Sequence, residues 1–117
     1  MYREPHPVKE GYIYVAEATS HPNQFKIGRS LRLEERFSQL SCSSPCRLSL
    51  KYSLQCKDYI EVEKTLHKLF NRSRLHGEWF DLNAAELYLL ETHAKELQTL
   101  NSWKQFLDWQ HEHRLLF

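Results

Sequence analysis

The chain has 117 residues, of which 41% are hydrophobic, 13% aromatic and 26% charged, as in an ordinary soluble globular domain. No apolar run approaches the roughly 20 residues of a membrane-spanning helix, and the first ten residues lack the apolar stretch of a signal peptide. We therefore expect a cytoplasmic protein without a membrane partner, whose three cysteines (Cys42, Cys46 and Cys56) are reduced thiols.

Charge is distributed unevenly along the chain, although the net charge is only +1. The segment from Lys26 to Arg74 holds eleven Lys/Arg and five Asp/Glu, a local balance of +6, whereas the remaining residues hold five and ten, a balance of −5. A basic middle region suits an anionic polymer such as DNA or RNA, but solvated basic faces also arise without any partner. The charge pattern alone leaves both interpretations open.

The beginning of the chain predicts a polar arm followed by a hairpin. Residues 1–10 contain two prolines and form the expected arm, and residues 11–18, GYIYVAEA, have the Tyr, Ile and Val content of a strand. Residues 20–24 predict a loop, and FKIGRS over residues 25–30 predicts the second strand. Gly28 is unusual there, because glycine in a strand loses backbone entropy and offers no side chain for packing. It indicates a kink or a close approach to the backbone, for example by a phosphate.

A helix and a third strand are predicted next. Ser30 is placed to cap a helix over residues 31–40, in which Leu33, Phe37 and Leu40 recur at helical spacing. The segment SCSSPC, residues 41–46, ends that helix. Alternating apolar and polar residues then predict a strand over residues 47–55.

Three further helices are predicted in the second half of the chain. The first covers residues 58–74, and a short extended segment, EWFDL, separates it from the second. The three capping pairs are Asp58 with Glu61, Asn83 with Glu86, and Ser102 with Gln105. The predicted fold is a small α/β (α+β) domain, with a three-stranded, mainly antiparallel sheet flanked by helices.

The helix over residues 58–74 places its two central glutamates differently. Its apolar stripe consists of Tyr59, Val62, Leu66, Leu69 and Phe70. At 100° per residue, Glu61 lies about 140° from the middle of the stripe and is expected to face water. Glu63 lies only about 60° away, at the edge of the buried face, and His67 follows one turn later on the same side.

Two interpretations of Glu63 remain open, because a carboxylate at the rim of a core needs a cation or hydrogen-bond donors. In the first, Glu63 forms a structural ion pair with Lys64, Lys68 or an arginine. In the second, it binds a metal ion while Arg29 and Arg36, both expected near the rim of the sheet, hold a phosphate.

Several short motifs, in this order and spacing, resemble the GIY-YIG nuclease superfamily. More narrowly, the chain is similar to a short phage and bacterial branch of that superfamily. The motifs are YIY (12–14), KIG (26–28), Arg36 eight residues after the glycine, E-x-x-L-H-x-x-F (63–70) and GEWF (77–80). The resemblance covers residues 11–82, which would form the nuclease core, with 1–10 as an N-terminal arm and 83–117 as a C-terminal helical extension packed on that core.

The resemblance implies a metal-dependent endonuclease that hydrolyses DNA phosphodiester bonds with one Mg²⁺ or Mn²⁺, RNA being a second candidate substrate. Glu63 would hold the metal, Tyr14 would activate the attacking water with help from Lys26, and Arg36 would stabilise charge on the phosphate. Tyr12 and His67 are further catalytic candidates. The expected substrate-binding residues are Gly28, Arg29, Arg32, Lys64, Arg72 and Arg74.

The sequence departs from the family pattern at three points. Lys26 replaces the first tyrosine of the second motif, and Tyr12 stands where the first motif has its glycine, with Gly11 one place early. The asparagine that follows the metal-binding glutamate in other branches has no clear counterpart here. These departures bear on the activity and not on the predicted fold.

Three rival functions fit parts of the sequence less completely. A binding module on the same fold would hold nucleic acid in a metal-independent, salt-sensitive manner without cutting it. A regulatory protein would dock a partner or a second copy through Trp103, Phe106 and Trp109, although these aromatics are also typical of a core. A zinc site from His111, His113 and the cysteines is poorly supported, because the cysteines lack a matched pair at zinc-finger spacing.

Overall fold

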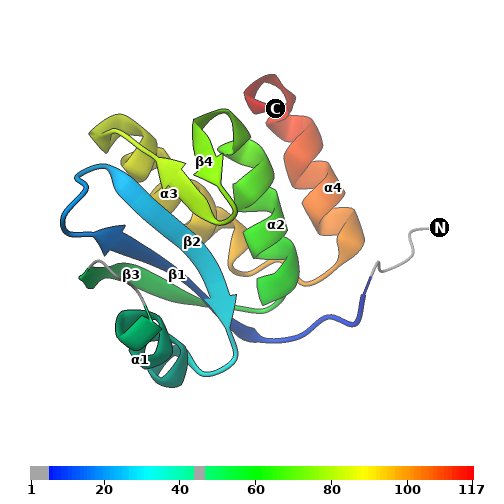
Figure 1. Cartoon of the computed structure of the whole chain (residues 1–117). Helices are drawn as coiled ribbons and strands as arrows, with labels where there is room; N and C mark the ends of the chain where they lie inside the picture. The colour runs from blue at the N-terminus through cyan, green and yellow to red at the C-terminus, as the bar shows by residue number, and fades with distance from the viewer. Residues whose placement is uncertain (1–5, 44–46) are drawn as a thin grey trace.

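The computed structural model describes residues 6–43 and 47–117 as an α+β fold around one sheet (Figure 1). The first five residues of the predicted arm, the end of the SCSSPC segment and the Cys46 thiol lie outside the described residues. Cys42 is an exposed free thiol and Cys56 a buried one.

The sheet has five strands in the order β3-β1-β2-β5-β4, and each neighbouring pair is antiparallel. The strands are β1 (Gly11–Ala18), β2 (Gln24–Ser30), β3 (Leu48–Cys56), β4 (Arg74–His76) and β5 (Trp79–Asp81). The three predicted strands are present, but a three-stranded sheet is wrong, since the β4–β5 hairpin extends the sheet beyond β2. All three residues of β4 are exposed, so their sequence carries no alternation that would predict a strand.

The α-helices are α1 (Leu33–Ser43), α2 (Tyr59–Leu69), α3 (Ala84–Leu97) and α4 (Trp103–Glu112), with short 3₁₀ turns at Asn71–Ser73 and Arg114–Leu116. The three predicted capping pairs are confirmed. The N–H of Glu61 donates to Asp58, that of Glu86 to Asn83, and that of Gln105 to Ser102.

Two predicted helix boundaries are wrong. Ser30 does not cap α1, because its hydroxyl accepts from the N–H of Arg32 at 3.0 Å, in a local turn before the helix begins. α2 ends at Leu69 and not at residue 74. The chain turns there, and Arg74 enters β4 to pair with β5.

One hydrophobic cluster joins the sheet to α2, α3 and α4, whereas α1 lies away from these helices beside the strands (Figure 1). Ile13, Val15 and Ile27 of the sheet belong to this cluster, as do Val62 and Leu66 of α2. Phe106 and Trp109 are also buried in it, which confirms that these two aromatics are core residues. Within the described part of the chain, no helix has the length and apolar character needed to cross a membrane.

Glu61 is buried, with 5% of its surface exposed, so the expectation that it faces water is wrong. The N-terminal arm covers the start of α2. His6 Nε2 lies 3.2 Å from Glu61 Oε1, and the N–H of Tyr59 donates to the Lys9 carbonyl. Helical periodicity describes only the face turned to the sheet and gives no information about a segment that crosses the opposite face.

Candidate active site

The predicted catalytic residues gather where β2 continues past the end of β5. Within the described residues, β5 pairs with β2 only at Gln24, Phe25 and Lys26, and the Ile27 N–H donates to the Glu78 carbonyl at 2.9 Å. The last residues of β2 therefore extend beyond this neighbour. α2 lies against the same part of the sheet and supplies the carboxylate and the imidazole.

Gly28 is required by the side chain of Tyr14. The two residues face each other across the β1–β2 pair, and the Tyr14 ring covers Gly28. A Cβ at residue 28 would collide with the Tyr14 Cζ and hydroxyl oxygen. The close approach that the sequence indicated is therefore made by a side chain of this protein. Contact between Gly28 and substrate stays a prediction.

Tyr14 is almost fully buried, and its hydroxyl forms no hydrogen bond of good geometry among the described residues, although the Arg36 guanidinium lies close enough to act on it as a donor. Burial raises the pKa of Tyr14, and the Arg36 guanidinium acts in the opposite direction. The charges of Glu78 and Glu63 raise this pKa further. The phenol of β1, the arginine of α1 and the carboxylate of α2 thus influence one another across one site.

Glu63 is a buried carboxylate whose charge is only partly balanced by cations and hydrogen bonds. Only 7% of its surface is exposed, Arg29 Nη1 lies 3.9 Å from its Oε1, and its buried Oε2 has no hydrogen bond within the described residues. Burial and the nearby charge of Glu78 raise the pKa of Glu63 to about 7 against the opposing charges of Arg29, Lys26 and Lys64. The predicted location of Glu63 at the edge of the buried face is confirmed.

His67 is fixed one turn further along α2. Its Nε2 lies 2.7 Å from the Ile27 carbonyl oxygen, which only accepts, so Nε2 carries the hydrogen and Nδ1 keeps a lone pair. The ring packs against Phe80 with 5.2 Å between centroids. Burial lowers the pKa of His67, which keeps the imidazole neutral at physiological pH.

Lys26 is held by Glu78, a residue for which the sequence pattern predicted no role. Lys26 Nζ lies 2.9 Å from Glu78 Oε2, and only 13% of the lysine side chain is exposed. Glu78 also raises the pKa of both Glu63 and Tyr14, so it belongs to the electrostatic environment of the site. The GEWF motif contained this residue, but only the β2–β5 register places it beside Lys26.

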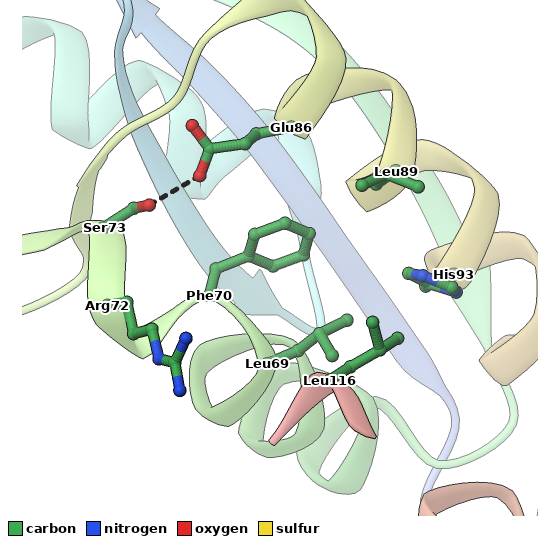
Figure 2. A pocket seen from close by; sticks show the side chains of 8 residues that line it. All are labelled: Leu69, Phe70, Arg72, Ser73, Glu86, Leu89, His93 and Leu116. Carbon is green, nitrogen blue, oxygen red and sulfur yellow. Dashed lines mark hydrogen bonds between the residues drawn. The ribbon is translucent and has the colours of Figure 1, made fainter. Parts of the chain in front are cut away.

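The remaining candidates are placed by the charges that they contribute or by the cavities that they line. Lys64 and Arg74 are near, since their charges act on Glu63 and His67 respectively. Tyr12, two residues before Tyr14 on β1, and Arg32 line a hollow at the start of α1, where Arg32 pairs with Glu35 at 3.6 Å. Arg72 lines another cavity, together with Glu86 of α3 (Figure 2).

A comparison with protein-family models matches residues 11–109 to the T5orf172 domain. The chain belongs to the T5orf172 domain family. This family occurs in phage proteins and is linked to nuclease-like domains. The comparison with curated proteins found no match, and the comparison with solved structures found none either. The T5orf172 match begins with β1 and runs through α3 into α4, so it includes all the residues gathered around Glu63.

The site of this T5orf172 domain fits one hard divalent cation. Mg²⁺ and Mn²⁺ prefer oxygen ligands and are commonly bound through one or two carboxylates, with water and substrate phosphate completing the shell. The buried, unpartnered Oε2 of Glu63 is such a ligand, and a cation beside it would offset the cost of burying the carboxylate. Arg29 and Arg36 place positive charge beside Glu63 and Tyr14 respectively.

Proposed function

We propose that this T5orf172 domain is a GIY-YIG-type endonuclease that hydrolyses DNA phosphodiester bonds with one Mg²⁺ or Mn²⁺. The observation that carries the proposal is Glu63, a buried carboxylate with one unpartnered oxygen and with Arg29, Lys26 and Lys64 as the cations that act on it. A purely structural ion pair would be expected to have closer contact than the 3.9 Å between Arg29 and Glu63.

The arginines would bind and polarise the phosphate. A guanidinium presents several donors in a rigid planar arrangement that matches phosphate oxygens, and it is always charged. Arg29 extends from β2 next to Glu63, and Arg36 extends from α1 next to Tyr14, so a phosphate between them would be contacted from two elements. The metal held by Glu63 would supply Lewis-acid stabilisation of the charge that develops on the phosphate oxygens.

In its phenolate form, Tyr14 would accept the proton of the attacking water. Burial opposes formation of its phenolate and Arg36 favours it, so the arginine has a second role in setting the proton affinity of Tyr14. Lys26 would act indirectly, by holding the Glu78 carboxylate near both Tyr14 and Glu63. The neutral His67, with its free Nδ1, is the alternative proton acceptor.

The proposal is tested by measuring the cleavage of supercoiled plasmid in three separate reactions, which contain Mg²⁺, Mn²⁺ or EDTA. We expect nicking that requires metal and falls by at least about 100-fold in Glu63→Gln. Glu61→Gln is the matched control, because it removes another buried carboxylate from the same helix and should keep most of the activity. Equal loss in both variants, or cleavage that persists in EDTA, would contradict the proposal.

One observation favours a second candidate, a nucleic-acid-binding module that does not cut. The Tyr14 hydroxyl is buried and Lys26 is paired with Glu78, so neither group is exposed to substrate in this conformation. Such a module would retard DNA on a gel with the same affinity in EDTA and in Mg²⁺, and it would give no product under any condition. Retention of DNA without product would therefore favour this candidate.

A further inference from the structure

A second group of metal-ligating side chains lies on the C-terminal helices, separate from Glu63. His93 and Glu96 lie one turn apart on α3, and His113 follows the last residue of α4. Each offers one ligand atom, and these atoms all lie within 4.8 Å of one another. We propose that His93, Glu96 and His113 form a zinc site that joins α3 to the end of α4.

The hydrogen bond of His113 leaves its second nitrogen ready for a metal. His113 Nδ1 lies 2.7 Å from the Trp109 carbonyl oxygen, and a carbonyl only accepts, so Nδ1 carries the hydrogen. Nε2 therefore keeps its lone pair. Metal-binding histidines commonly donate their other N–H to a carbonyl or a carboxylate, which fixes the tautomer and the orientation of the ring.

Aromatic packing holds both imidazoles in place before any metal binds. The His113 ring stacks on Trp109 with 3.9 Å between centroids and 19° between planes. The His93 ring meets His113 nearly edge to face, at 5.6 Å and 79°, and is 9% exposed. Two ordered imidazoles lose little conformational entropy on binding, which favours a preformed site over a surface pair of histidines.

The donor set selects the class of metal. Two imidazoles and one carboxylate suit Zn²⁺, which binds nitrogen and oxygen ligands tetrahedrally, with water in the fourth position when the protein supplies three. Mg²⁺ prefers an all-oxygen octahedral shell and is a poor fit. His93 Nδ1 now lies 2.7 Å from Glu96 Oε1 and carries the hydrogen, so binding would replace this hydrogen bond by bonds to the metal and move the Nδ1 proton to Nε2 or to solvent.

Zinc at this site would stabilise the end of the chain against α3. The turn that follows His113 contains Leu116, which lines a cavity of about 180 Å³ together with His93 and Phe70. Figure 2 shows Leu89 and His93 of α3 facing Leu69, Phe70 and Leu116 across this cavity. A metal bridge from His93 to His113 would fix the wall that the C-terminal turn provides.

Zinc titration of the purified chain tests the site, with Glu63→Gln as the parent so that metal at Glu63 does not contribute. We expect one Zn²⁺ per chain, and at least a tenfold loss of affinity in His93→Gln and in His113→Gln. His111→Gln is the matched control, because His111 is an exposed histidine of α4, two residues before His113. This change should alter the affinity less than twofold. Unchanged binding in the first two variants, or an equal loss in His111→Gln, would overturn the proposal.

Two measurements keep the test decisive if a variant folds poorly. In the Glu63→Gln parent, one equivalent of Zn²⁺ should shift the imidazole NMR signals of His93 and His113 and leave those of His6 and His111 in place. Co²⁺ bound at the site should give a ligand-field spectrum without a thiolate charge-transfer band. A thiolate band, or shifts confined to other histidines, would overturn the proposal.

Discussion

Two buried polar side chains, Glu63 and Tyr14, determine what the candidate active site can do. Each has a buried oxygen without a hydrogen bond of good geometry among the described residues, and the charge of Glu63 contributes to raising the pKa of Tyr14. An unsatisfied buried oxygen costs about 1–3 kcal/mol of stability. The structure therefore carries a local destabilisation that binding of a cation and a phosphate would relieve.

Replacing Glu63 by glutamine should stabilise the metal-free protein while it removes cleavage. The amide keeps the shape of the side chain but removes a buried charge whose one ion pair among the described residues is with Arg29, at 3.9 Å. We expect the free energy of unfolding to rise by about 1 kcal/mol in EDTA, measured by urea titration at pH 8. Glu61→Gln should have the opposite effect at pH 6, where His6 is protonated and lies 3.2 Å from Glu61. A fall in stability for Glu63→Gln would show that the fold already compensates this carboxylate without a metal.

Gly28→Ala should destabilise the protein through Tyr14. The new methyl group would overlap the Tyr14 ring, a form of overpacking that costs about 1–3 kcal/mol. Removing the ring should relieve the overlap, so the double variant Gly28→Ala/Tyr14→Ala should be clearly less destabilised than the sum of the single variants. Urea titration of the four proteins measures the coupling, and additive effects would show that the ring does not restrict residue 28.

At the level of the elements, α2 is held from two sides. Its apolar face packs on β1 and β2, and the N-terminal arm covers its first turn through His6 and the Lys9 carbonyl. His6 also lies 4.0 Å from Asp58, the residue that caps the helix. The arm therefore contributes to the position of the helix that carries Glu63.

The contribution of the arm should depend on pH. Burial acts to lower the pKa of His6, but the Pro7 carbonyl and the Glu61 and Asp58 carboxylates outweigh it and raise the pKa. A raised pKa in the folded state means that the protonated form stabilises the fold. This stabilisation is complete below the unfolded value of 6.5 and is lost as the pH rises through the folded value.

His6→Gln should accordingly lower the melting temperature more at pH 6 than at pH 8. The exposed His111, replaced in the same way, controls for the general loss of a titrating imidazole. Thermal unfolding of the three proteins at both pH values measures the difference. A loss that is equal at the two pH values would show that the ion pair with Glu61 contributes nothing.

The elements differ in how well the sequence predicts them. Strands β1, β2 and β3 and the three capped helices were predictable, because alternation and capping residues are local signals. β4 carries no such signal, and the burial of Glu61 depends on an arm more than fifty residues away in the chain. Gly28 was recognisable as unusual, but only the β1–β2 register shows that Tyr14 is the group that requires it.

On the scale of the whole molecule, the basic segment from Lys26 to Arg74 contributes both to the fold and to the candidate site. Some of its cations are already paired inside the protein, as Lys26 is with Glu78 and Arg32 with Glu35. Arg29 is different, because its contact with Glu63 is long, at 3.9 Å, and 38% of its side chain is exposed. Arg29 is therefore well placed to contact a phosphate.

DNA binding should reveal this difference through its dependence on salt. Each phosphate contact releases bound counterions, so its loss reduces the slope of log affinity against log salt by about 1. We expect Arg29→Ala to reduce the slope by about this amount. Lys95→Ala, which removes an exposed cation on α3 outside the basic segment, should leave the slope unchanged. Fluorescence anisotropy with a short duplex in EDTA measures both. Equal slopes for Arg29→Ala and the unaltered protein would show that the bound phosphate does not contact Arg29 beside Glu63. This result would contradict the proposed location of the active site.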